Sequence, residues 1–284
     1  MYICGQTKLL DKINHLVETG RFPRFSILVG NVGSGKKLIS DYAAKQLGAN
    51  FVPCDIKADS VREVIYNSYT VTEKTLYMFF DCDGMSVTSK NALLKVTEEP
   101  PNDSYFIMTV QDINSVLGTI VSRGTVFYLD PYTQTDLQNF INEKKIEFKS
   151  KELNIVKSIC STPQDVLNCS KLDVTELYNL ADKFIQFIGS ANLANEFKIS
   201  TFLNLRKDEE SEKFDPILYL RCIMLCCNNY LLENCSKEDT EVFCKIIKNT
   251  SKHLSELQMK GSSKQMIIDN WILNTHIDIA GGVC

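Results

Sequence analysis

Several features that would restrict the location or chemistry of this protein are missing from its sequence. No run of apolar residues approaches the roughly 20 residues that a membrane-spanning helix requires. The first residues, MYICGQTKLLDK, do not form a signal-peptide pattern, so we expect a cytoplasmic protein without a membrane partner. A net charge of −4 is not typical of a chain that binds nucleic acid by itself. Any DNA contact should therefore come from a local patch or from an assembly.

Ligands for a metal ion are also scarce. The eleven cysteines contain no Cys-x-x-Cys pair, and the three histidines lie far apart in the sequence. Zinc sites use closely spaced cysteine and histidine ligands, so the sequence predicts no zinc site and no other metal site. We expect reduced thiols that are mostly buried, as in cytosolic proteins.

The first 130 residues alternate between short apolar runs and helical patterns. This alternation is typical of an α/β domain with a parallel sheet. The expected strands cover residues 26–29, 51–54, 75–81, 105–110 and 126–129, and the expected helices cover residues 8–18, 37–47, 60–68 and 89–98.

Beyond Asp130-Pro131 the pattern is helical. Helices are expected over residues 135–143 and 150–159, followed by a turn at Thr162-Pro163 and a short helix. From about residue 174 the apolar spacing predicts three longer helices with packing faces, and polar residues 208–213 predict a loop. We therefore expect an all-α part after the α/β domain, with divisions at 1–130, 131–173 and 174–284.

A glycine-rich loop follows the first expected strand. Residues 30–37 read GNVGSGKK, which matches the phosphate-binding pattern G-x-x-x-x-G-K. Backbone N–H groups of such a loop, together with its lysine, can be directed at phosphates. The candidate nucleotide-binding residues in the loop are Gly30, Gly33, Ser34, Gly35, Lys36 and Lys37. Lys37 stands where the pattern requires the Ser or Thr whose hydroxyl binds Mg²⁺, so we expect a loop that could hold ATP or ADP and binds magnesium weakly or not at all.

Three further stretches carry a resemblance to a known family. They are LYMFFDCD at residues 76–83, NALLKVTEEPP at 91–101 and SRG at 122–124. Together with Gly5-Gln6 near the start, they resemble the AAA+ clamp-loader subunits, which include the bacterial gamma and delta-prime subunits and the replication factor C small subunits. The resemblance implies an AAA+ P-loop NTPase domain at 1–130, a small helical lid domain at 131–173 and a C-terminal helical collar domain for oligomerisation at 174–284.

The sequence departs from active members of this family at several positions. Aligned on the NALLK stretch, the family's Asp-Glu pair falls on Phe80 and Asp81, which leaves Asp81 as a weak remnant of the acids that hold magnesium and water. Shifted by one residue, Asp81 would take the metal position and Cys82 the catalytic one. The lid arginine is replaced by Gln164, while Gln111 remains as a polar group that could orient water or phosphate. Together these changes argue against ATP turnover in the chain's own site.

Arg123 is the residue that the resemblance assigns most directly to catalysis. In this family the arginine of a Ser-Arg-Cys stretch reaches the γ-phosphate held by the neighbouring subunit, as an arginine finger in trans. This sequence keeps Ser122 and Arg123 and has Gly124 in place of the cysteine. Taken alone, such an arginine would be read as an ordinary surface residue, but the accompanying motifs favour the finger.

Basic residues on the expected helices allow two interpretations. Lys90, Lys95 and Arg62 could contact DNA inside an assembly, or they could merely solvate a helix face. We favour solvation for Lys95 and leave both interpretations open for Lys90 and Arg62.

Our hypothesis is a clamp-loader subunit of the delta-prime type that is not an autonomous ATPase. It would join other clamp-loader subunits in a hetero-oligomeric ring or spiral, donate Arg123 to a neighbouring ATPase and help to load a sliding clamp on primer-template DNA. Any bound nucleotide would be structural. One alternative is an active, DNA-stimulated ATPase of the same ring, in which Lys36, Asp81 or Asp83 and Gln111 do the chemistry. Another is an AAA+ adaptor or helicase-loader-like protein that binds no clamp.

Overall fold

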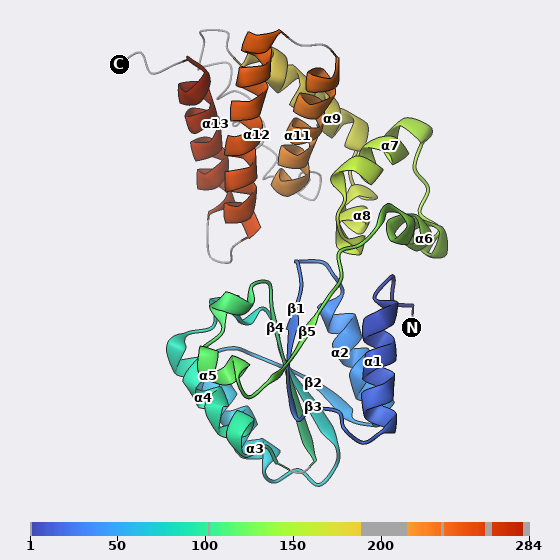
Figure 1. Ribbon diagram of the computed structural model, residues 1–284, viewed down its shortest axis with the longest axis vertical. Coiled ribbons are helices and arrows are strands. Elements are labelled where there is room, and N and C mark those ends of the chain that lie inside the picture. The colour runs from blue at the N-terminus through green and yellow to red at the C-terminus, as the bar shows by residue number, and fades with distance from the viewer. Residues whose placement is uncertain (1, 102, 189–214, 234–235, 259–262, 281–284) are drawn as a thin grey trace. The chain divides into compact units, whose positions relative to one another are not determined.

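The computed structural model describes residues 2–101, 103–188, 215–233, 236–258 and 263–280. The loop predicted at residues 208–213 lies outside them. The chain divides into two compact units (Figure 1). Residues up to Asp136, together with Thr162–Gln164, form the first unit, and the remaining residues form the second.

A five-stranded parallel sheet is the centre of the first unit. Its strands are β1 (Phe25–Val29), β2 (Asn50–Cys54), β3 (Thr75–Phe79), β4 (Ser104–Val110) and β5 (Thr125–Tyr128), in the order β2-β3-β4-β1-β5. β1 pairs with β4 and with β5, so that Ile27 lies opposite Met108 on one side and Val126 on the other. A parallel strand that is covered on both faces reads as a continuous apolar run, and all five residues of β1 are buried. The predicted α/β fold with a parallel sheet is confirmed.

Helices cover both faces of this sheet. On one face lie α1 (Thr7–Glu18) and α2 (Lys36–Leu47), and on the other lie α3 (Ala58–Ser68), α4 (Val87–Glu98) and α5 (Gly118–Val121) (Figure 1). Successive side chains of a strand point to opposite faces. Ile27 therefore packs in the core under α3, α4 and α5, whereas Leu28 packs in the core under α1 and α2.

The third strand is shorter than predicted. We expected residues 75–81, but β3 ends at Phe79. Asp81 adopts a left-handed backbone conformation, with φ 47° and ψ 53°, and a short 3₁₀ helix, η1 (Cys82–Gly84), follows it. The left-handed residue ends the extended conformation and turns the chain at the carboxyl edge of the sheet.

The second unit is helical. Its helices are α6 (Gln134–Lys144, which begins in the first unit), α7 (Ser150–Ile159), α8 (Pro163–Cys169, likewise shared), α9 (Val174–Phe187), α11 (Pro216–Leu232), α12 (Lys237–Gln258) and α13 (Lys264–Ala280). α7 packs against both α9 and α11, so the helices predicted as lid and collar share one compact unit. The division between residues 173 and 174 stays a prediction.

Aromatic side chains fill the core of the second unit. Trp271 of α13 is fully buried, with the ring of Phe184 at 4.8 Å and the ring of Tyr219 at 6.3 Å between centroids. α13 is a helix that the sequence analysis did not include among its three. Its buried residues include Ile267, Ile268, Trp271 and Ile272, and its exposed apolar residues include Met266, Leu273 and Ile277. Because the helix carries apolar residues on all of its faces, its sequence shows no single apolar stripe of the kind that marks an amphipathic helix.

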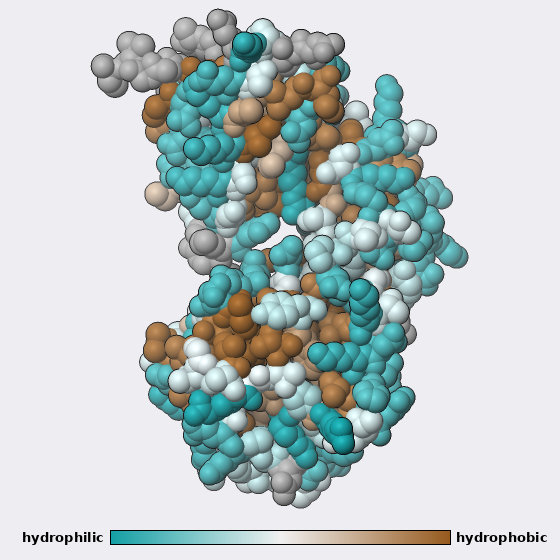
Figure 2. Space-filling model, viewed as in Figure 1, coloured by the Kyte–Doolittle hydropathy of each residue, from teal (hydrophilic) through white to brown (hydrophobic). Residues whose placement is uncertain are grey.

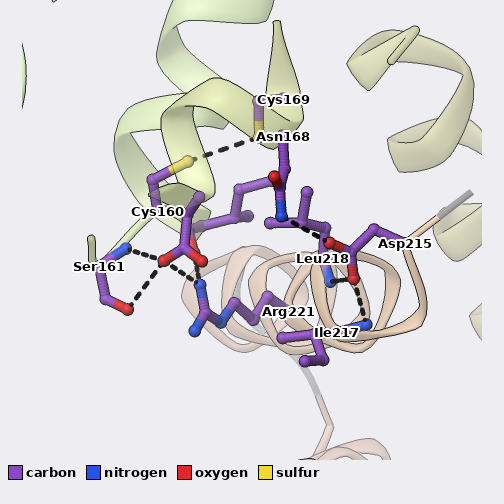
Figure 3. A network of polar contacts seen from close by, with 10 residues as sticks. Cys160, Ser161, Asn168, Cys169, Asp215, Ile217, Leu218 and Arg221 are labelled. Carbon is purple, nitrogen blue, oxygen red and sulfur yellow. Dashed lines mark hydrogen bonds and ion pairs between the residues drawn. The ribbon is translucent and has the colours of Figure 1, made fainter. Parts of the chain in front are cut away.

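A polar network joins α7, α8 and α11 within the second unit (Figure 3). The Arg221 guanidinium donates to the Asp165 carboxylate at 2.7 Å and to the Ile159 carbonyl at 3.0 Å. Asp165 also accepts the backbone N–H and the hydroxyl of Ser161, at 3.0 and 3.1 Å. The Arg221 and Asp165 side chains are only 17% and 14% exposed, so this ion pair is largely shielded from water.

The visible face of each unit mixes hydrophilic and apolar side chains (Figure 2). The exposed large apolar residues of the first unit include Val32, Leu38, Tyr66, Val87 and Tyr128. Within the described ranges, no helix combines the length and the apolar character needed to cross a membrane.

Candidate nucleotide-binding site

The residues predicted for the site follow three neighbouring strands of the first unit. The glycine-rich loop follows β1, Asp81 follows β3 and Gln111 follows β4. Because these strands are parallel, their carboxyl ends lie at the same edge of the sheet. Open α/β sheets bind ligands at this edge, so the fold brings the predicted residues to one place.

The loop is a tight turn that leads directly into α2. The backbone N–H of Gly30 donates to the Val110 carbonyl at 3.0 Å, which anchors the loop to β4. Gly33 and Gly35 have φ values of 77° and 82°, a conformation that favours glycine. The Ser34 hydroxyl donates to the Asn31 carbonyl at 2.7 Å. The first N–H groups of α2 therefore lie beside the loop, as an anion site requires.

Lys36 is held inside the loop that it follows. Its ammonium group donates to the Gly30 carbonyl and, at 2.9 Å, to the Asn31 carbonyl. Burial lowers the pKa of Lys36, and the nearby carboxylates of Asp81 and Asp83 oppose that shift. An ammonium group has three donors, so two can hold the loop while the third faces a phosphate. The loop and Lys36 thus fit a nucleotide phosphate.

Residues from far along the sequence close one side of the loop. A Cβ atom added at Gly33 would lie 2.5 Å from Cβ of Gln164 and 2.8 Å from the Thr162 hydroxyl oxygen. The Tyr132 hydroxyl donates to the Ser34 carbonyl at 2.7 Å. Burial raises the pKa of Tyr132 to about 12, so its hydroxyl stays protonated and remains a donor at neutral pH. Gln164, predicted at the lid-arginine position, is thereby placed against the loop.

In the ungapped alignment on the NALLK stretch, neither expected magnesium position offers an oxygen ligand; the alignment shifted by one residue would instead place the Asp81 carboxylate at the metal position. Lys37 is exposed at the start of α2, and its Nζ lies 5.6 Å from the centroid of the Phe80 ring. Mg²⁺ requires oxygen ligands in near-octahedral geometry, whereas an ammonium group only donates hydrogen bonds and a phenyl ring has no lone pair. The side chains at these two positions do not fit a magnesium ion.

The two acids after β3 have different surroundings. The backbone N–H of Asp81 donates to the Thr109 hydroxyl at 2.9 Å, which fixes the turn at the end of the strand. The Asp83 carboxylate accepts the backbone N–H of Gln111 at 3.0 and 2.9 Å and that of Asp112 at 3.1 Å. Asp83 therefore holds the segment after β4 and is a poor candidate for a general base. The same bonds fix the backbone of Gln111, whose side chain is half-buried.

Arg123 lies on the surface after α5. Its guanidinium forms an ion pair with Glu98 at 3.1 Å and donates to the Thr119 carbonyl at 2.9 Å. The Arg123 and Glu98 side chains are 39% and 54% exposed. Gly124, the departure from the family's cysteine, packs closely: an added Cβ would lie 3.1 Å from the Phe25 ring. A cysteine at this position would require neighbouring side chains to move.

The structure supports neither of the two interpretations that were left open for Lys90. Lys90 is only 8% exposed and donates to the Ser115 carbonyl at 2.7 Å, so it anchors the segment after β4 rather than solvating a helix face or facing DNA. The Lys95 ammonium lies 4.8 Å from the centroid of the Tyr69 ring. Arg62 is exposed and pairs with Asp59 at 3.0 Å.

Gln6 is a structural residue whose role the sequence analysis did not identify. Its side-chain amide donates to the Asp130 carbonyl at 2.7 Å and accepts the Asp130 N–H at 2.9 Å. This pair reproduces backbone pairing and joins the start of α1 to the end of β5. The Gly5-Gln6 signal was noted, but contact with a residue 124 positions away could not be read from it.

Cysteine and metal-binding side chains show no further site in the part of the chain that the structure describes. No group of three or more His, Cys, Asp or Glu side chains there could hold a metal ion. Its nine cysteines are all free thiols, and only Cys244 is exposed.

Comparison with known proteins gives matches in sequence and in fold. The family described as "DNA polymerase III, delta subunit" matches residues 54–133. The DNA polymerase III subunit gamma of Buchnera aphidicola subsp. Schizaphis graminum is 27% identical over 254 residues, which cover 76% of this chain and 69% of that protein. The tau subunit of Escherichia coli is 25% identical over 190 residues, covering 54% of this chain and 29% of that protein.

Solved structures give a match in fold alone. The Thermotoga maritima RuvB Holliday junction branch migration motor superposes with a TM-score of 0.51 at 13% identity, over 76% of this chain and 87% of that one. This likeness agrees with the P-loop NTPase fold. The delta-subunit, gamma and tau matches together support a relationship of this chain to the AAA+ clamp-loader family of DNA polymerase III subunits.

Proposed function

We propose that this chain is a clamp-loader subunit of the delta-prime type, which supplies Arg123 to a neighbouring ATPase and does not turn over ATP in its own site. The observation that carries the proposal is the pair at the magnesium positions, Lys37 and Phe80, which offers no metal ligand. The hydrogen bonds that Asp83 accepts from the backbone N–H groups of Gln111 and Asp112 also support the absence of turnover. A carboxylate whose oxygens are already engaged in this way is poorly placed to polarise water.

Arg123 suits a role in trans. Both side chains of its ion pair with Glu98 are exposed to solvent, and exposed ion pairs contribute only about 0.2–1 kcal/mol to stability. A phosphate on a neighbouring subunit can therefore compete for the guanidinium. An arginine finger stabilises charge in the transition state and accelerates hydrolysis by roughly 10³–10⁵ in the best-characterised cases.

In this proposal the chain works as one member of a hetero-oligomeric replication complex in the cytoplasm. Its partners are other loader subunits, the sliding clamp and primer-template DNA. The nucleotide loop contributes to structure, through ATP or ADP, rather than to turnover.

The test measures ATP hydrolysis by the partner ATPase subunits with sliding clamp and primed DNA. The chain is added as wild type, as Arg123→Ala or as Arg21→Ala, an exposed arginine just after α1. We expect a fall of about ten-fold or more with Arg123→Ala, no fall with Arg21→Ala and no turnover by the chain alone. Equal activity of the two variants would overturn the finger.

A second candidate, an active DNA-stimulated ATPase, is favoured by one observation. Lys36 keeps a geometry in which its third donor can face a phosphate. Magnesium-dependent hydrolysis by the isolated chain, lost in Lys36→Ala, would establish this candidate. Failure to bind any sliding clamp or loader subunit would instead favour an adaptor.

A further inference from the structure

Lys37 and Phe80 stand at the two positions where magnesium ligands were expected, and Lys37 brings a positive charge to the nucleotide loop. Lys37 follows Lys36 directly in the first turn of α2. It is exposed, and its ammonium group lies 5.6 Å from the centroid of the Phe80 ring. Two consecutive lysines thus stand at the N-terminal end of a twelve-residue helix, beside a glycine-rich loop.

Electrostatics at this point favour a polyanion. The N-terminal end of a helix carries a partial positive charge, and the loop adds two ammonium groups. Two acids lie near Lys36, Asp81 and Asp83. Asp83 is compensated by the backbone N–H groups that it accepts, and Asp81 leaves one carboxylate against the two ammonium groups and the helix N-terminus. The same positive charges disfavour a divalent cation, because like charges at a few ångströms repel.

Lys37 can exchange its ring contact for a phosphate. An exposed ammonium group is held only weakly by an aromatic ring, whereas hydrogen bonds between an ammonium and a phosphate are charge-assisted and strong. Lysine is a flexible side chain with three donors. From the second position of α2 it can reach the phosphates that the loop and Lys36 hold.

We propose that the loop binds a nucleoside diphosphate or triphosphate without a divalent cation, and that Lys37 supplies the positive charge that the metal brings in other sites. The inference rests on the proposed function in one respect, namely that the loop holds a nucleotide. It is independent of Arg123 and of any partner subunit.

The test uses the full chain alone and a fluorescent ADP carrying an N-methylanthraniloyl group. Affinity is measured in excess EDTA and in excess MgCl₂, for wild type, Lys37→Ala and Lys45→Ala. Lys45 is a matched control because it is an exposed lysine in the last turn of the same helix, paired with Asp41 at 2.7 Å. We expect wild type to bind at least as tightly in EDTA as in magnesium. Lys37→Ala should weaken binding in EDTA by about ten-fold, the loss of one charge-assisted contact, and Lys45→Ala should leave it unchanged.

A double variant tests whether oxygen ligands at these two positions make nucleotide binding depend on magnesium. Lys37→Thr with Phe80→Asp restores both oxygen ligands and should bind the fluorescent ADP more tightly in magnesium than in EDTA, by about ten-fold. Circular dichroism checks that it folds, since Phe80 is half-buried; the single-lysine comparison remains decisive if it does not. Wild-type binding that requires magnesium, no binding in either buffer, or equal affinities of Lys37→Ala and Lys45→Ala would overturn the inference.

Failure here and failure of the proposed function are distinguishable. A magnesium-dependent loop with an intact Arg123 effect on the partner ATPase would overturn only the metal-free site. A metal-free loop without any Arg123 effect would overturn only the finger.

Discussion

Asp83 accepts the backbone N–H of Gln111 through both of its carboxylate oxygens, at 3.0 and 2.9 Å. It also accepts the N–H of Asp112 and the hydroxyl of Ser115, each at 3.1 Å. A side chain that follows β3 thus fixes the segment that follows β4, and Lys90 supports the same segment from α4. The edge of the sheet beside the nucleotide loop is held by polar contacts and not by apolar packing alone.

Replacing Asp83 should destabilise the first unit. Asp83→Ala leaves three donors without their charged acceptor and should lower the free energy of unfolding by about 2–3 kcal/mol. Asp83→Asn keeps one acceptor oxygen and should cost less. Asp59→Ala, which loses only an exposed ion pair with Arg62, serves as the control and should be nearly neutral. Urea denaturation followed by circular dichroism measures all three, and equal losses for Asp83→Ala and Asp59→Ala would contradict the anchoring role.

Alanine at Gly33 should cost more than alanine at another glycine with the same backbone requirement. Gly33 and Gly48 both have positive φ, 77° and 63°, but only Gly33 has neighbours within 4 Å of an added Cβ. The backbone strain is common to both, about 1–2 kcal/mol. The contact with Gln164 at 2.5 Å should add about 1–3 kcal/mol for Gly33→Ala. Thermal unfolding of the two variants checks the difference, and indistinguishable midpoints would be evidence against the close approach.

The ion pair between Arg221 and Asp165 should show strong coupling in the second unit. Arg221→Met keeps the apolar stem but leaves a largely shielded carboxylate unpaired, and Asp165→Asn leaves the guanidinium unpaired. Each should destabilise by about 2–4 kcal/mol, since removal of one partner of a shielded pair costs more than removal of both. The double variant should therefore recover about 1–3 kcal/mol relative to the sum of the single losses. A double-mutant cycle in urea measures the coupling, and strict additivity would show that the two side chains act separately.

Buried thiols should make stability fall at alkaline pH. Burial raises the pKa of Cys54 and of Cys82 from the ordinary value of 9.0 to about 12 in each case. The unfolded chain then releases these protons near pH 9 while the folded chain keeps them, so the stabilisation is complete below pH 9 and is lost as the pH rises. Each thiol should contribute a slope of about 1.4 kcal/mol per pH unit between those values.

Substitution of the thiols tests this linkage. The Cys54→Ala and Cys82→Ala variants should show a shallower fall in the free energy of unfolding between pH 9 and 11, whatever their stability at pH 7. Cys244→Ala, which removes an exposed thiol, should keep the wild-type slope. The comparison requires urea denaturation at several pH values, and parallel slopes for all variants would refute the burial argument.

The features that follow from local sequence could be predicted. Alternating apolar runs and helical spacing gave the α/β fold and its parallel sheet, because buried parallel strands and amphipathic helices leave distinct periodicities. The glycine-rich loop was identified because its pattern is contiguous, from Gly30 to Lys37. The limits of the strands could not be predicted as closely. β3 ends two residues earlier than predicted, since Asp81 takes a left-handed conformation that its neighbours in sequence do not reveal.

The missed features depend on contacts between distant segments. The bond from Lys90 to Ser115 spans 25 residues, and that from Asp83 to Gln111 spans 28. A lysine on a helix and an acid after a strand have no local signature that separates an anchor from a surface charge. The contact of Lys37 with Phe80 likewise joins residues that are far apart in the sequence. The sequence shows that each of them departs from the family pattern, but it does not show that the two side chains lie together.

The contact between Lys37 and Phe80 also makes the present state hard to reverse by single steps. A threonine at position 37 alone would place a hydroxyl beside a phenyl ring and remove one charge, with no second ligand for a metal. An aspartate at position 80 alone would place a carboxylate next to Lys37, and the two would pair with each other instead of binding magnesium. Substitution of only one of the two residues would therefore remove the present contact without creating a magnesium site. Single substitutions toward the metal-binding pair should accordingly be disfavoured in evolution.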